Sequence, residues 1–193
     1  MLIAFIGSHG TGKTTTCYAL KKQLGKDWLV FEDSYRKITH QLGYSRPKEA
    51  LLQEQNKHIA CTAMTAAAFG CLMEWNSGLK DSGMIDVGPP SLLAYHRYWM
   101  KICDTPVSSF LLKLCRQLSD QVDYYVYLPA NAIPLVEDNM RSDDPIFQKD
   151  IDQWVLRNLE ELCVPEEKII TPRSLHVEDR VNEIQDKIQC CQS

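Results

Sequence analysis

The chain has 193 residues, 45% hydrophobic and 24% charged, with a formal net charge of −4. This composition predicts an ordinary folded core and excludes a disordered chain. The negative net charge gives no overall attraction for nucleic acid, although it is compatible with a local basic groove. No run approaches the roughly 18 apolar residues of a membrane span, so we expect no membrane partner.

Short apolar runs alternate with longer amphipathic ones along the chain. We expect strands at 2–6, 29–31, 84–87, 124–128 and 168–170, and helices at 12–24, 34–42, 47–75, 91–102, 107–119, 145–162 and 177–190. This alternation predicts a three-layer, doubly wound α/β fold with a five-stranded parallel sheet. We expect a single domain over residues 1–193, with a small lid segment at 129–147.

The longest predicted helix, 47–75, rests on apolar residues that recur at helical spacing. This spacing predicts one buried stripe. Its members are Leu52, Ile59, Ala63, Ala67, Cys71 and Trp75.

The stretch GSHGTGKT follows the first predicted strand, opens the first helix and fits G-x-x-x-x-G-K-[ST] completely. Backbone N–H groups in such a loop converge on phosphate oxygens, and the helix dipole adds attraction. Lys13 would reach the β- and γ-phosphates of ATP, and the Thr14 hydroxyl would ligate Mg²⁺. The predicted ATP-binding residues here are Gly7, Ser8, His9, Gly10, Thr11, Gly12, Lys13, Thr14 and Thr15.

An acid, Asp86, follows the apolar run that starts at Met84. At the end of a strand beside the loop, its carboxylate would hold a magnesium-bound water opposite Thr14. Capping of the following turn is the alternative.

Four stretches together resemble the P-loop kinases related to thymidylate kinase, and especially the small AAA-type ATP-binding proteins of bacteriophages and bacteria. The nicotinamide-riboside kinase domain and phage 5-hydroxymethyluracil DNA kinases are similar too. The stretches are GSHGTGKTT, FEDSYRKI, IDVGPPSLLAYHRYW and VYLPANAIPLVEDNMRSDDPIFQKDID. The resemblance implies a P-loop fold with ATP at the carboxyl ends of the strands, and kinase activity.

One position departs from that pattern. The family commonly has an arginine directly after the acid at Asp86, and the resemblance assigns it to holding the acceptor's phosphate. This chain has Val87 there. The difference weakens the case for a monophosphate acceptor and favours one that presents a bare hydroxyl.

The residues after the second predicted strand lie on the rim where an acceptor would bind. Glu32 is a candidate to accept a proton from an attacking hydroxyl, and Arg36 to contact the acceptor. Asp33 is an alternative base, or the cap of the following helix. A Glu–Arg pair at the surface is the plain alternative for Glu32 and Arg36.

Three other places carry candidate residues. Tyr95 and Arg97 in AYHRYW suit a flat base with its sugar or phosphate, although aromatic residues at helical spacing are as typical of a core. Arg141 in the lid segment would approach charge on the transferred phosphoryl group, as the family pattern implies, with a solvated loop arginine as the alternative. Arg173 follows the last strand, where such folds border the adenine; a capping turn is equally compatible.

The leading interpretation is a kinase that moves the γ-phosphate of Mg·ATP to a nucleoside or deoxynucleotide. Its catalytic candidates are Lys13, Asp86, Arg141 and Glu32. A hydroxymethylated pyrimidine in DNA is the alternative acceptor, and a P-loop ATPase or nucleotide-binding module is a further option. The sequence leaves the oligomeric state open, a homodimer included. It shows no signal-peptide pattern, so we expect a cytoplasmic protein, in the host cytoplasm if phage-encoded.

Overall fold

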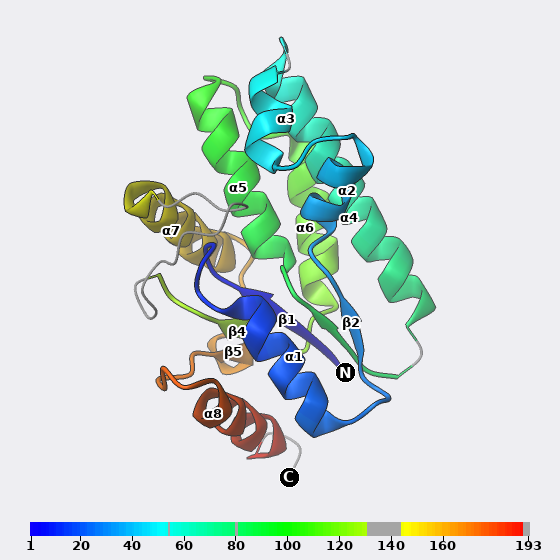
Figure 1. Ribbon diagram of the computed structural model, residues 1–193, viewed down its shortest axis with the longest axis vertical. Coiled ribbons are helices and arrows are strands. Elements are labelled where there is room, and N and C mark those ends of the chain that lie inside the picture. Colours follow the sequence, from blue (N-terminus) through cyan, green and yellow to red (C-terminus); the bar gives the residue numbers. More distant parts are fainter. Residues whose placement is uncertain (54, 80, 131–143, 191–193) are drawn as a thin grey trace.

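The computed structural model describes residues 1–53, 55–79, 81–130 and 144–190. Its sheet has five parallel strands in the order β2-β3-β1-β4-β5, so β1 lies at the centre (Figure 1). The predicted doubly wound α/β fold is therefore confirmed. The strands are β1 (Leu2–Ile6), β2 (Leu29–Phe31), β3 (Gly83–Ile85), β4 (Tyr124–Tyr127) and β5 (Ile169–Ile170).

Helices cover both faces of the sheet (Figure 1). Those on one face are α1 (Lys13–Leu24) and α8 (Val177–Cys190). Those on the other are α2 (Ser34–Gln41), α3 (Pro47–Gln53), α4 (Lys57–Gly78), α5 (Pro89–Ile102), α6 (Ser109–Asp120) and α7 (Pro145–Glu161); a 3₁₀ turn, Glu166–Lys168, precedes β5. Within the described ranges, no helix is long and apolar enough to cross a membrane.

The central strand β1 contributes side chains to the hydrophobic core on each face of the sheet. Successive side chains of a strand point to opposite faces, so Ile3 and Phe5 enter the core under α1 and α8. Ala4 and Ile6 enter the larger core on the other face. All four are fully buried, which accounts for the continuous apolar run in the sequence.

The prediction of one helix over 47–75 is wrong. The chain forms α3 and α4, and α4 begins after its N-cap residue Asn56. The predicted stripe is also wrong: Leu52 of α3 and Ile59 of α4 are 52% and 57% exposed. The buried face of α4 instead carries Cys61, Met64, Thr65, Ala68, Phe69 and Leu72.

The chain leaves the sheet earlier after β3 than the predicted strand 84–87 implies. Gly88 donates its N–H to the carbonyl of Phe5 at 2.8 Å, and α5 starts at once with Pro89 and Pro90. Proline suits the first turn of a helix because its missing N–H would have no helical partner there. This turn brings Asp86 and the start of α5 close to β1.

Candidate active site

The glycine loop leaves β1 at Ile6 and is shaped by positive φ angles. Gly7, Gly10 and Gly12 have φ of 131°, 74° and 83°, which side-chain-bearing residues rarely adopt. At Gly7 a Cβ would also lie 2.2 Å from the carbonyl oxygen of Leu128. The loop therefore requires glycine for its backbone path as well as for any bound phosphate.

The loop ends at the N-terminus of α1. Gly12 is the N-cap residue, and it provides no side-chain hydrogen bond to the first turn. A helix N-terminus without a side-chain cap presents N–H groups and the positive end of the dipole to an anion. The geometry fits a phosphate group at this point.

Lys13 points back across the loop. Its ammonium donates to the carbonyl oxygen of Ser8 at 2.5 Å, and the side chain is only 8% exposed. The Thr11 hydroxyl donates to the same carbonyl at 3.0 Å. Lysine and loop are thus held together, with the cation on the side where a phosphate would enter.

Thr14 and Asp86 meet at the first turn of α1. The Thr14 hydroxyl donates to Oδ2 of Asp86 at 2.9 Å. The other carboxylate oxygen, Oδ1, is buried and has no hydrogen-bond partner among the described residues. Burial raises the pKa of Asp86, against the opposing effects of Thr14 and Lys13. A hydroxyl and an orphaned carboxylate oxygen are ligands that suit Mg²⁺, with water and phosphate oxygens completing its octahedron.

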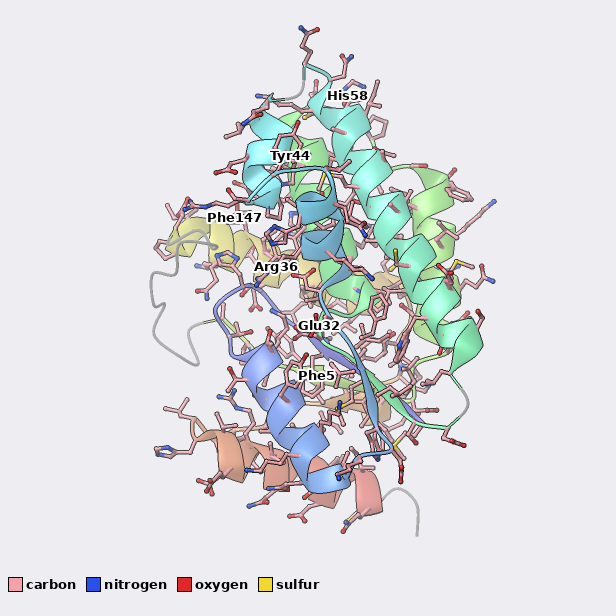
Figure 2. The ribbon with its side chains drawn as sticks, turned by 45° about the vertical axis from the view of Figure 1, so that its right-hand side comes forward. Phe5, Glu32, Arg36, Tyr44, His58 and Phe147 are labelled. Carbon is pink, nitrogen blue, oxygen red and sulfur yellow. The ribbon has the colours of Figure 1, made fainter. Side chains whose placement is uncertain are left out.

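A cavity of about 280 Å³ opens from this loop. Residues 9–14 form one wall, and α2, the start of α3, α5 and the first turn of α7 form the others. Figure 2 shows Arg36 of α2 and Phe147 of α7 on the same side of the loop. The aromatic members of the lining are Tyr35, Tyr95, Trp99 and Phe147.

The tip of the loop packs against α5 and α7. His9 stacks on Phe147 with ring centroids 5.0 Å apart, and its Nδ1 lies 3.4 Å from the hydroxyl of Tyr95. The buried amide of Gln148 donates to the His9 carbonyl at 2.8 Å. One turn later, Asp152 accepts a hydrogen bond from Tyr127 at 2.8 Å. Helix α7 thereby supports the glycine loop from outside.

Of the two acids after β2, Asp33 lines the cavity and Glu32 does not. Glu32 is exposed and accepts a hydrogen bond from Tyr18 at 2.5 Å. Neighbouring residues of an extended chain point in opposite directions, so both acids cannot face the acceptor side. Asp33 also caps α2, accepting from the N–H groups of Tyr35 and Arg36.

Helix α5 brings Tyr95 to the cavity and takes Arg97 away from it. Arg97 forms an ion pair with Glu161 at 2.6 Å and lies over the ring of Trp154. Residues two apart on a helix face different directions, whereas those four apart share a face. Trp99, four residues after Tyr95, is accordingly the second cavity residue of this helix.

The remaining predicted residues lie elsewhere. Thr15 is exposed on the first turn of α1. Arg173 follows β5 in an exposed loop, and its N–H donates to Glu183 at 2.7 Å; it does not line the cavity. Arg141, with most of the segment predicted as a lid, lies outside the described residues.

Sequence reasoning missed Arg46 and Phe147 as cavity residues and Gln148 as a support of the loop. Arg46 stands before α3, and the other two are in the first turn of α7. Only tertiary packing brings these segments to the loop, and no local spacing marks them. The nearest signal was the stretch that ends FQKDID, which contributed to the family resemblance as a whole.

An AAA domain family model matches residues 2–180. The chain belongs to this AAA domain family. A search of curated proteins gave no match.

Solved structures show how this AAA domain folds. The deoxyadenosine kinase of M. mycoides with bound dCTP superposes with a TM-score of 0.67 at 13% identity, covering 98% of this chain and all of that one. The NadR protein with NAD and AMP-PNP gives 0.65 at 14% identity, over 96% of this chain and 49% of that one. Shikimate kinase from Acinetobacter baumannii with shikimate gives 0.54 at 16% identity, over 98% and 93%. At such identities the similarity establishes a shared P-loop kinase-like fold.

Proposed function

We propose that this AAA domain is an ATP-dependent kinase that transfers the γ-phosphate of Mg·ATP to a nucleoside-type acceptor. One observation carries the proposal: the glycine loop is itself a wall of the cavity, with Gly10, Gly12, Lys13 and Thr14 all in its lining. A phosphoryl group held by the loop would therefore face a space built for a second molecule. An ATPase requires only a water molecule at that point.

Different residues would bind the phosphates, the magnesium ion and the acceptor. Main-chain N–H groups of the loop and Lys13 would hold the phosphates, and Thr14 with Asp86 would hold Mg²⁺. That ion would neutralise charge on the phosphate oxygens during transfer. The aromatic wall would orient the acceptor and exclude water, since positioning and electrostatics dominate phosphoryl transfer. Arg141 stays a proposal from the sequence for the charge that approaches the moving group.

The structural neighbours support this choice of donor and acceptor. Their names describe a deoxyadenosine kinase with dCTP or dATP bound and a NadR protein with the ATP analogue AMP-PNP. The flat rings of Tyr95 and Trp99, which line the cavity, are suited to stack on a nucleobase. We therefore favour a nucleoside-type acceptor over a small aliphatic one.

The test is phosphoryl transfer from γ-labelled ATP with magnesium, using free nucleosides, nucleoside monophosphates and DNA that contains 5-hydroxymethyluracil. We expect label on a free nucleoside-type acceptor. Label on the DNA alone would assign the modified base as acceptor, and loss of ATP to water with every acceptor would identify an ATPase.

A variant pair connects the result to the loop. Lys13→Ala should abolish transfer while the protein keeps its fold by circular dichroism. Lys22→Ala, at the other end of α1 and exposed, should transfer normally. Unchanged turnover in Lys13→Ala would contradict the proposed mechanism.

A further inference from the structure

Among the described residues, the charges that line the cavity are predominantly positive. Apart from Lys13 of the loop, they belong to Asp33, Arg36 and Arg46. The chain as a whole has a net charge of −4. The wall opposite the loop, with two guanidinium groups and one carboxylate, therefore has a positive charge, opposite in sign to the net charge of the chain.

Asp33 does not neutralise these cations. Asp33 Oδ1 accepts hydrogen bonds from the N–H groups of Tyr35 and Arg36, at 3.1 and 3.2 Å. Its other oxygen is 3.8 Å from Nε of Arg36, which is too long for a good hydrogen bond. Arg36 forms no other ion pair within the described part of the chain.

Arg46 is still less engaged. No carboxylate among the described residues lies within ion-pair distance of it. Its acidic neighbour, Glu49, already accepts hydrogen bonds from the backbone N–H and hydroxyl of Ser45. A guanidinium in a cavity wall with spare N–H donors is suited to bind a phosphate or carboxylate with two parallel hydrogen bonds.

The position of these arginines changes the interpretation of Val87. The family resemblance places a phosphate-holding arginine there, and its absence favoured a bare hydroxyl acceptor. Val87 does line the cavity, so that part of the wall carries no cation. Arg36 and Arg46 bring guanidinium groups to the same cavity from α2 and from the start of α3 instead.

Resting on the proposed kinase function, we propose that the acceptor is a nucleoside monophosphate, with its base against the aromatic wall and its phosphate held by Arg36 and Arg46. The cavity volume of about 280 Å³ lies near the lower end of the range for small-molecule sites. That size suits a single nucleotide.

The chemistry of transfer agrees with this choice. The bond between the γ-phosphorus and its bridging oxygen breaks, and an oxygen of the acceptor's phosphate forms the new bond, giving ADP and a nucleoside diphosphate. With a second pKa of about 6, a phosphate monoester is already mostly dianionic at neutral pH. No proton has to be removed from it, so the exposed position of Glu32 is no obstacle.

The first arm of the test compares matched acceptors in the transfer assay: each deoxynucleoside against its own 5′-monophosphate. We expect monophosphates to be labelled with kcat/KM at least tenfold above that of the nucleosides. Equal or better use of nucleosides would overturn the acceptor assignment while leaving the kinase function standing.

The second arm measures binding and does not depend on turnover. Calorimetry with protein saturated in Mg·AMP-PNP, which fills the glycine loop, should show monophosphates binding at least tenfold more tightly than nucleosides. Arg46→Gln and Arg36→Gln should each weaken monophosphate binding about tenfold and change nucleoside binding less than twofold.

Lys37→Gln is the matched control, since it removes one positive charge from an exposed position on α2 outside the cavity lining. It should leave monophosphate affinity unchanged. Equal weakening by all three variants would show a general charge effect, and no weakening by either arginine variant would exclude the subsite. If ATP is only hydrolysed, the kinase function fails, and this binding comparison still decides whether the anion site exists.

Discussion

Arg180 of α8 is only 1% exposed, and its guanidinium donates a hydrogen bond to the hydroxyl of Thr16 on α1 at 3.0 Å. Thr16 in turn donates to the carbonyl of Gly12 at 2.9 Å. The same guanidinium donates to the carbonyls of Ser174 and Leu175, each at 3.2 Å. One buried cation thus joins the loop after β5 to the end of the glycine loop.

Replacing this arginine should weaken the whole fold. Arg180→Met removes all three donors. The buried contact to Thr16 is worth about 1–3 kcal/mol, and the two partly buried contacts to carbonyls are worth less. We expect a loss of about 3 kcal/mol in the free energy of unfolding, or about 10 °C in Tm. Urea denaturation followed by circular dichroism measures it. Lys187→Met on the exposed side of α8 should stay within about 0.5 kcal/mol; equal losses would show that Arg180 is not special.

The buried carboxylate of Asp86 should lower the free energy of unfolding at neutral pH and contribute to magnesium binding. Because burial raises its pKa above the ordinary 3.8, the folded chain holds this proton more tightly than the unfolded chain does. Stability is therefore lost as pH rises through the folded pKa. Asp86→Asn should melt above the wild type at pH 7, with an advantage that shrinks toward pH 4.

The same variant should lose its response to magnesium. Mg·ATP should raise the Tm of the wild type and have much less effect on Asp86→Asn, because a carbonyl oxygen replaces the anionic ligand. A lower Tm for the variant at neutral pH, or an undiminished magnesium effect, would contradict this role of Asp86.

His96 should make the fold sensitive to acid. It is fully buried, and burial together with the neighbouring Arg97 lowers its pKa to about 4. The unfolded chain takes up a proton near pH 6.5 and the folded chain does not, so stability present above pH 6.5 is lost as pH falls toward 4. The loss amounts to about 3 kcal/mol across that interval.

Denaturation at several pH values tests this dependence. In His96→Leu the slope between pH 6.5 and 4 should flatten. His40→Gln, at an exposed position on α2, should keep the slope of the wild type. A slope that survives in His96→Leu would assign the acid sensitivity to other groups.

Glu32 tests whether an acid outside the cavity takes part in transfer. Its carboxylate accepts a hydrogen bond from Tyr18, an exposed residue of α1, and this bond raises the pKa of Tyr18 to about 12. For a monophosphate acceptor, Glu32→Gln should change kcat by less than threefold. A loss of a hundredfold or more would instead indicate a hydroxyl acceptor with Glu32 as its general base, measured with each acceptor at saturation.

The loop and the sheet were predictable because their signals are local. A strand, three glycines, a lysine and a threonine at fixed spacing determine where phosphate binds, whatever the rest of the chain does. Strand alternation and helix periodicity also place Asp33 opposite Glu32 and Trp99 on another face than Arg97.

The opposite wall was not predictable in this way. Arg46 reaches the cavity because α3 packs against α2 and α4, and Phe147 because α7 packs against α5 and the loop; both depend on contacts between distant segments. Arg180 looks like an ordinary surface residue in an amphipathic helix, and only the structure reveals that it is buried. The break before α4 lies in the polar stretch 53–58, and it was missed because Leu52 and Ile59 on either side are seven residues apart, about two helical turns.

The close approach of Gly7 to the carbonyl of Leu128 means that phosphate binding and sheet assembly share a single position. In a saturation scan that records protein abundance and catalysis separately, damage at Lys13 would appear in catalysis alone. At position 7 every replacement would lower both protein abundance and catalysis, because any side chain would push apart β1 and the segment that follows β4. A glycine there would be retained even by a descendant that no longer used ATP.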